Sequence, residues 1–311
     1  MSLRIASLGS SFAAGPTIAP IEDESAGRSG ANYAHLVAER LGASLTDLSV
    51  CGATLLHLLD TPQDAGGRRF PPQVDALPAD ADVVLVLGGG NDIGYIGGIF
   101  QDTLSRSWAG SALLYLRGGG EGTGTETEAE AEARARLQLD VNGLARRYAA
   151  VLDAIHRRAP GARVLVVEYQ AVLGPDTRPG QDVVFGADRV AHHREVAARL
   201  LEATHLAVRG REAWCAPVGI AAASEAHAVG AERPWISGFT WKLFYRGGAY
   251  HPRPEGMVAI ADLVHAKLVE LGLTSQDQAA AITAAAGGGE ETEDGFATSN
   301  QSPVPNPLQK E

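Results

Sequence analysis

The sequence predicts an α/β protein in which a parallel sheet lies between layers of helices. Short apolar runs, typical of buried strands, alternate along the chain with stretches whose apolar residues recur at helical spacing. The clearest run is residues 83–87 (VVLVL), which is continuous and rich in β-branched side chains, as expected for a strand covered on both faces. We therefore expect a three-layer α/β/α sandwich with a central five-stranded parallel sheet.

Five segments are predicted as the strands of this sheet. They are residues 4–8, 44–50, 83–87, 163–168 and 213–218. The first strand runs into a turn of small residues, in which Gly9 lets the backbone bend sharply before Ser10 and Ser11. We find no internal repeat, so the strands are expected to belong to one sheet.

The segments between the strands are predicted as helices and loops. In residues 31–41, Tyr33, Leu36 and Val37 recur on one face, and Gly42 follows as a helix terminator. The other expected helices are a short one ending at residue 59, another over 74–77, and longer ones over 131–158, 189–208 and 252–271. Stretches rich in Pro and Gly are expected as loops over 16–30, 62–72 and 174–186, and residues 230–250 are expected to be irregular and aromatic.

Two acidic, low-complexity segments interrupt this pattern. Residues 117–130 (RGGGEGTGTETEAE) carry almost no apolar side chain, and we expect them to form a disordered insertion. Residues 274–311 are expected to form a disordered C-terminal tail for the same reason. The folded domain is therefore expected to span residues 1–273.

The charge of the chain is concentrated in these acidic segments. Of the formal net charge of −11, residues 121–132 and the tail contribute −5 each, so the remaining body is nearly neutral. A body without a basic surface is not typical of nucleic-acid binding, and we expect no nucleic-acid partner. The composition does not indicate an oligomeric state.

The N-terminus and the cysteines indicate an intracellular protein without a metal site. Too few apolar residues precede Gly9 for a signal sequence, and no apolar run approaches the roughly 20 residues of a membrane span. We therefore expect a cytoplasmic protein. Cys51 and Cys215 are expected to be buried, reduced thiols. Since no Cys-x-x-Cys pair or other ligand cluster occurs, neither a metal nor a cofactor is expected.

Three stretches that could carry chemistry each follow a predicted strand. They are Gly-Ser-Ser at 9–11, Cys-Gly-Ala at 51–53 and Gly-Gly-Asn-Asp at 89–92. In a parallel sheet all three meet at one edge, and His251 joins them just before the last helix. Taken alone, the serines are more typical of a helix cap. Together the stretches supply a hydroxyl nucleophile, an imidazole base and donors for an oxyanion, which are the requirements of acyl transfer.

With these stretches in this order, the chain resembles the SGNH (GDSL-type) hydrolase superfamily. The usual Gly-Asp-Ser of the first block is Gly-Ser-Ser at 9–11, and the glycine of the second block is Gly52. The third block, Gly-x-Asn-Asp, matches 89–92, and the last, usually Asp-x-x-His-Pro, is Gly-Ala-Tyr-His-Pro at 248–252. The resemblance covers residues 8–257 and implies a flavodoxin-like, three-layer fold.

The resemblance also implies a role for each matching residue. Ser11 would be the nucleophile, and His251 the general base and acid. The backbone N–H groups of Ser11 and Gly52 and the side-chain amide of Asn91 would form the oxyanion hole. The implied activity is that of an esterase or lipase that cleaves small-molecule acyl esters through an acyl-enzyme, without a cofactor.

Two positions depart from the usual blocks. Ser10 replaces an Asp that is not the catalytic acid, so this change is expected to matter little. Gly248 replaces the Asp that usually orients the histidine. Either a backbone carbonyl at or near Gly248 accepts a hydrogen bond from His251 Nδ1, or a carboxylate from elsewhere does so. The carboxylate candidates are Asp176, Asp182 and Asp188.

Several alternatives stay open at this point. An acyltransferase of the same fold would use the same residues, and a non-catalytic lipid- or carbohydrate-binding relic would explain the missing Asp at 248. The retained Ser11, Asn91 and His251 count against the relic. Residues 93–116 are rich in large apolar side chains and form either plain core or a wall for an acyl group. The adjacent His192 and His193 are expected to lie on the surface.

Overall fold

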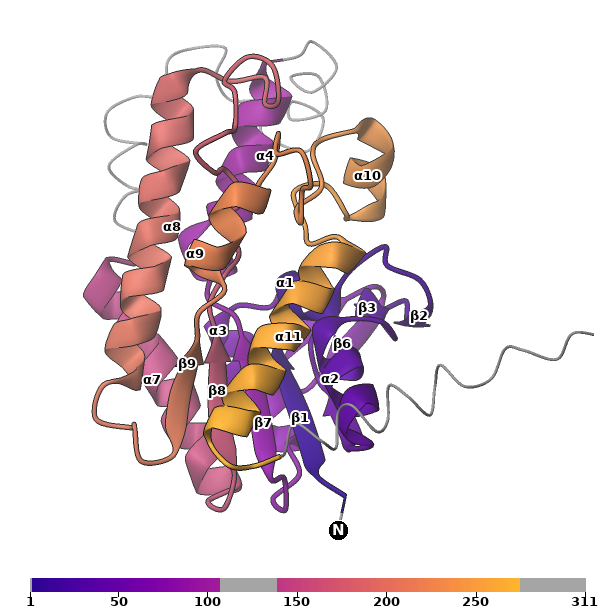
Figure 1. Cartoon of the computed structure of the whole chain (residues 1–311), viewed down its shortest axis with the longest axis vertical. Helices are drawn as coiled ribbons and strands as arrows, with labels where there is room; N and C mark the ends of the chain where they lie inside the picture. Colours follow the sequence, from indigo (N-terminus) through magenta and orange to yellow (C-terminus); the bar gives the residue numbers. More distant parts are fainter. Residues whose placement is uncertain (1, 107–138, 275–311) are drawn as a thin grey trace, which may run out of the picture.

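The computed structural model describes residues 2–106 and 139–274 (Figure 1). The acidic insertion predicted at 117–130 lies outside the described residues. So does the predicted C-terminal tail, apart from Thr274.

A five-stranded parallel sheet forms the centre of the structure, as the sequence predicts. Its strands lie in the order β4-β1-β7-β8-β9, and every neighbouring pair is parallel. The strands are β1 (Arg4–Gly9), β4 (Ser44–Asp47), β7 (Val83–Leu87), β8 (Arg163–Val167) and β9 (Cys215–Val218). In the register of the sheet, Ile5 of β1 lies between Leu45 of β4 and Val83 of β7. All five residues of β7 are buried, because helices cover both faces.

Two groups of helices cover the sheet. Helix α2 (Tyr33–Leu41) packs against α11 (Pro254–Glu270), and Figure 1 shows α11 crossing in front of the strands. Helix α7 (Val141–Arg158) packs against both α8 (Ala187–Val208) and the short α3 (Leu55–Leu59). The predicted three-layer sandwich is therefore confirmed.

Short-range signals set the ends of these helices. The side chain of Asn32 accepts hydrogen bonds from the N–H groups of Ala34 and His35 and so caps α2, while Gly42 ends it in the left-handed region. Asp140 caps α7 in the same way. The predicted start of this helix at residue 131 is therefore wrong, because residues 139 and 140 are not helical and α7 begins at the residue after its cap.

Some segments predicted as loops contain secondary structure. Residues 16–30 include a small antiparallel pair, β2 (Ile21–Asp23) with β3 (Arg28–Ser29). Residues 62–72 include a hairpin, β5 (Gln63–Ala65) with β6 (Arg68–Phe70), whose turn is made by two glycines with positive φ. The region 230–250 includes helix α10 (Trp241–Arg246).

The remaining elements lie near the carboxyl ends of the strands. They are α1 (Ser11–Ala14), α4 (Tyr95–Ser105), α9 (Ala221–Ser224) and short 3-10 helices at Gln73–Ala76, Asn91–Ile93 and Glu225–His227. Both cysteines are free thiols; Cys215 is buried as predicted, whereas Cys51 is only half-buried. Within the described ranges, we find no helix with the length and apolar character that crossing a membrane requires.

The turn after β1 leads to a first prediction, Gly9→Ala. A Cβ atom at this position would lie 2.7 Å from the Cβ atom of Ala13 and closer still to the carbonyl oxygen of Leu87. We expect the free energy of unfolding to fall by about 1–3 kcal/mol, because the packed backbone of β7 cannot move away. Urea unfolding measures this change. Gly161→Ala is the control, since nothing lies within 4 Å of its added Cβ atom; equal stability of the two variants would contradict the prediction.

Candidate active site

The structure brings Ser11 and His251 together, although 240 residues separate them. Ser11 is the first residue of α1, which follows β1 after Ser10, and His251 lies just before α11. The hydroxyl oxygen of Ser11 is 2.8 Å from Nε2 of His251. Both residues are almost buried, with exposed fractions of 8% and 7%. This is the distance at which a histidine can take a proton from a serine hydroxyl.

A backbone carbonyl holds the other nitrogen of the histidine ring. Nδ1 of His251 lies 2.7 Å from the carbonyl oxygen of Ala249. The carbonyl predicted at or near Gly248 is therefore that of the next residue, Ala249, while the Gly248 carbonyl accepts a hydrogen bond from the Ser237 hydroxyl. The ring carries its proton on Nδ1, and this N–H donates a hydrogen bond to the Ala249 carbonyl. Nε2 is therefore unprotonated and faces the hydroxyl of Ser11.

No carboxylate takes the place of this carbonyl at Nδ1 among the described residues. Of the three predicted candidates, Asp182 is bound to Arg178 by two side-chain hydrogen bonds. The structure also explains the glycine at 248, because a Cβ atom there would lie 2.5 Å from the hydroxyl oxygen of Thr17. The usual Asp therefore has no room at this position unless Thr17 moves.

Tyr250 fixes the turn that carries the histidine. Its φ of +56° lies in the left-handed region, which a bulky residue rarely adopts. The side chain is fully buried, and its hydroxyl lies 2.8 Å from the hydroxyl of Thr103 in α4. Its ring packs against Phe100 and Phe239. The sequence analysis missed this role, since nothing in the sequence links Tyr250 to Thr103.

The predicted oxyanion-hole donors lie in the loops after β1, β4 and β7. Gly52 has a φ of +78°, which favours glycine. The side-chain amide of Asn91 donates one hydrogen bond to the Ala53 carbonyl at 2.8 Å, which leaves its second N–H for another acceptor. Among the described residues, the N–H groups of Ser11 and Gly52 have no protein acceptor.

Backbone hydrogen bonds connect these loops at the edge of the sheet. The N–H of Val50 donates to the Gly9 carbonyl, and the N–H of Ser10 donates to the Leu87 carbonyl, both at 3.1 Å. The buried side chain of Gln73 bonds both the N–H and the carbonyl of Gly9. The sequence analysis did not identify Gln73, because its partner is 64 residues away.

Asp92 links the third loop to two helices. Its buried carboxylate accepts hydrogen bonds from the N–H of Leu55 at the start of α3 and from Arg147 in α7. Burial raises the pKa of Asp92, and the hydrogen bond from Arg147 opposes this effect. The loop that carries Asn91 is thereby fixed to the helical layer behind it.

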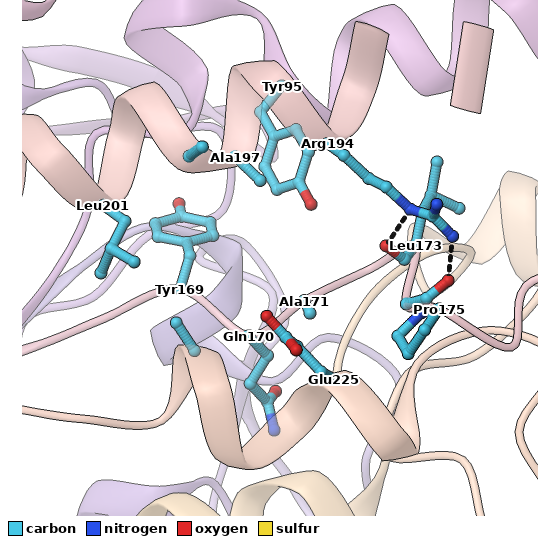
Figure 2. Close-up of a pocket in the computed structure, with 13 residues that line it drawn as sticks. Tyr95, Tyr169, Gln170, Ala171, Leu173, Pro175, Arg194, Ala197, Leu201 and Glu225 are labelled. Carbon is cyan, nitrogen blue, oxygen red and sulfur yellow. Dashed lines mark hydrogen bonds between the residues drawn. The ribbon is translucent and has the colours of Figure 1, made fainter. Parts of the chain in front are cut away.

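An apolar cavity of about 340 Å³ lies next to these loops, between the end of β8, α4, α8 and α9 (Figure 2). Tyr169 connects it to the candidate site, because its ring lines the cavity while its hydroxyl lies 2.7 Å from the hydroxyl of Ser10. Figure 2 shows Tyr95 and Ala197 on the side of the cavity opposite Gln170. Of the region 93–116, Tyr95 lines the cavity and Ile99 is buried core, while 107–116 lie outside the described residues.

The histidine pair in α8 differs from its prediction. His193 is buried rather than exposed, and its Nε2 lies 2.6 Å from a carboxylate oxygen of Asp102 in α4. Arg189 binds the same carboxylate. This cluster joins α4 to α8. Groups of three or more potential metal ligands are not found in residues 2–106 and 139–274.

Comparison with known proteins assigns the family. The family model of the GDSL-like Lipase/Acylhydrolase family matches residues 7–259. The chain belongs to this family. This assignment agrees with the resemblance of the four sequence blocks.

Three proteins from Streptomyces are similar to this GDSL-family chain. It is 38% identical over 93 residues to Lipase 2 of Streptomyces coelicolor, a match that spans 29% of this chain and only 30% of that lipase. Its fold is similar to that of phospholipase A1 from Streptomyces albidoflavus, with a TM-score of 0.64 and 18% identity over 86% of this chain and 100% of that one. An extracellular lipase from Streptomyces rimosus gives a TM-score of 0.62 at 19% identity, over 86% and 99% of the two chains.

The burial of His251 leads to a second prediction. Burial lowers its pKa to about 4, although the hydrogen bond to the Ala249 carbonyl works in the opposite direction. Between pH 6.5 and 4 the unfolded chain therefore binds a proton that the folded protein excludes. The free energy of unfolding should fall by up to about 3 kcal/mol as the pH drops through this range.

NMR titration of the imidazole and urea unfolding at a series of pH values measure these effects. The ring of His251 should titrate with a midpoint near 4. In His251→Gln, this part of the pH dependence of stability should disappear. A midpoint near 6.5 would contradict the prediction, since that is the ordinary value for an exposed histidine.

A third prediction concerns the hydrogen bond between Tyr250 and Thr103. Tyr250→Phe and Thr103→Val should each lower the free energy of unfolding by about 1 kcal/mol, and the double variant should lose less than the sum. Thermal unfolding of the four proteins measures this coupling. Tyr245→Phe removes a hydroxyl from a tyrosine that is largely exposed and should change nothing; additive losses would show that the two hydroxyls do not interact.

Proposed function

We propose that this protein hydrolyses carboxylic esters through an acyl-enzyme formed on Ser11, with His251 as the base. The observation that carries the proposal is the hydrogen bond of 2.8 Å between Ser11 and an imidazole whose other nitrogen is held by Ala249. A serine hydroxyl is a poor nucleophile until an adjacent base takes its proton. The intact pair also favours an enzyme over a binding relic, which would not need it.

The reaction follows from the geometry of this pair. His251 Nε2 takes the proton of Ser11 as the hydroxyl oxygen attacks the ester carbonyl, and the resulting oxyanion accepts hydrogen bonds from Ser11, Gly52 and Asn91. The tetrahedral intermediate expels the alcohol, which receives the proton from His251. Water then gives a proton to His251 and attacks the acyl-enzyme, and the acid leaves as Ser11 regains its proton.

The Ala249 carbonyl supports the histidine differently from a carboxylate. It fixes the tautomer and the orientation of the ring, but it provides only a dipole to stabilise the imidazolium that forms during the reaction. The low pKa of His251 keeps the resting ring neutral at neutral pH, as a base requires. We expect the protonated intermediate to be less stabilised than in a triad.

The cavity beside Tyr169 supports an ester with an apolar acyl group. Its lining is mostly apolar and aromatic, with Gln170, Arg194 and Glu225 as the polar side chains. Tyr169 links it to the residue before the nucleophile. A volume of about 340 Å³ lies within the range of small-molecule sites. We infer that small-molecule acyl esters are the substrates, with the acyl group directed toward this cavity. A series of p-nitrophenyl esters of increasing chain length tests this inference.

The proposed roles lead to a fourth prediction, on Ser11, His251 and Asn91. Ser11→Ala and His251→Ala should each lower the turnover of a p-nitrophenyl ester by about three or more orders of magnitude, and the double variant by little more, because the two residues act as one unit. Asn91→Ala should cost about two to three orders, since the two backbone donors remain. Exhaustive chelation of metal ions should leave the activity of the wild type unchanged.

Controls separate this result from unfolding. Ser25→Ala removes a serine hydroxyl that donates to Gly66 in the hairpin turn, and it should keep wild-type activity. A serine-directed phosphonate should label the wild type at Ser11 and leave Ser11→Ala unlabelled. Wild-type activity in a folded Ser11→Ala would refute the nucleophile. A wild type that neither hydrolyses esters nor takes up phosphonate would favour the binding relic.

A further inference from the structure

Helix α10 exposes aromatic side chains to an unusual degree. None of its six residues is buried. Trp241 is 36% exposed and Tyr245 is 68% exposed. Within residues 2–106 and 139–274, these are the only aromatic residues among the exposed large hydrophobic ones. Single exposed aromatic side chains are common on protein surfaces, whereas a contiguous group of them marks an interaction surface.

The exposed rings belong to a packed group, which we call the aromatic platform: Phe239, Trp241, Phe244 and Tyr245. The ring of Trp241 lies 5.4 to 6.0 Å from each of the other three, measured between centroids. The Thr240 side chain caps the helix, and Gly247 ends it. The caps and the ring contacts support the platform, which reduces the ordering of side chains that binding through it would require.

The charges that α10 itself carries are basic. Residues 233–254 contain four basic residues and no acidic one, between Glu232 and Glu255, in a chain whose net charge is −11. Two of the four, Lys242 and Arg246, are exposed on α10 itself. Neither forms an ion pair with any other described residue, whereas Arg253 pairs with Glu255. The surface of α10 therefore attracts anions.

The platform also packs against the turn that carries His251. Helix α10 ends at Arg246, five residues before His251. Phe100 packs against both Phe244 and Tyr250, and Phe239 also packs against Tyr250. In Figure 1, α10 stands out from the body at the end of the molecule where α4 and α9 lie, beyond the carboxyl ends of the strands.

We propose that α10 docks this protein onto the surface of an anionic phospholipid bilayer, so that esters held in that surface reach Ser11. The proposal rests on the proposed function. Trp and Tyr favour the boundary between lipid and water, and each Lys or Arg near an anionic bilayer contributes about 1 kcal/mol. Lys242 favours lipid over a protein partner, because Lys is depleted in protein–protein interfaces, whereas Trp, Tyr and Arg are common in both kinds of surface. The short helix makes the docking weak and reversible.

Flotation with vesicles tests the docking. The full chain is mixed with vesicles of phosphatidylglycerol and phosphatidylcholine in equal parts, or of phosphatidylcholine alone, at low and high salt. We expect binding to the anionic vesicles at low salt, and loss of it at high salt because the attraction is screened. Trp241→Ala/Tyr245→Ala and Arg246→Glu should each weaken it by about tenfold or more.

Arg209→Glu is the matched control for Arg246→Glu. Arg209 is also exposed, but it lies between the end of α8 and the start of β9. This is the side of the amino ends of the strands, whereas α10 lies beyond their carboxyl ends (Figure 1). This variant should bind as the wild type does. Absence of binding by the wild type, equal binding to both kinds of vesicle, or equal loss in the two arginine variants would each overturn the proposal.

A water-soluble ester separates the docking from the chemistry. The α10 variants should turn over p-nitrophenyl acetate at the wild-type rate while they lose activity on long-chain esters dissolved in the anionic vesicles. Turnover of the soluble ester by a wild type that does not bind vesicles would refute the docking alone. Vesicle binding that depends on α10, without turnover of any ester, would support the docking and refute the proposed hydrolase.

Discussion

The parallel pairing of β1 with β4 and β7 is the constraint on which the candidate site depends. In this register the three strands end side by side, so the loops that begin at Ser10, after β4 and at Gly88 share one edge of the sheet. The hydrogen bonds of Val50 with Gly9 and of Ser10 with Leu87 extend this pairing beyond the strands. A hydroxyl and oxyanion donors from distant parts of the chain are thereby held at fixed positions.

The histidine reaches this edge by a different route, because no strand carries it. It depends on the strained turn at Tyr250, on the hydroxyl pair that joins Tyr250 to Thr103, and on the carbonyl of Ala249. A glycine at 248 gives Thr17 the room that a side chain would take. The missing Asp is thus part of a different local packing, in which a carbonyl two residues before the histidine orients the ring.

The same aromatic packing extends from the histidine to the surface. Tyr250 contacts Phe100 and Phe239, and Phe239 contacts the exposed Trp241. A surface that binds lipid at α10 would therefore lie in direct contact with residues that hold the base. Under this proposal, the surface that receives the lipid lies beside the turn that carries His251, while the soluble chemistry at Ser11 does not require α10.

The sequence by itself determined the sheet and the four blocks that meet at its edge, because these depend on local patterns. The β-branched run of β7, the helix terminator Gly42 and the Gly-x-Asn-Asp stretch are each recognisable within a few residues. Only the tertiary structure decided what holds the site in place. The fold brings distant residues together in the pairs Tyr250–Thr103, Asp92–Arg147 and His193–Asp102. The contact of the Ala249 carbonyl with His251 depends on a strained turn. A periodic pattern records which face of an element is buried, but it does not record which distant side chain lies opposite.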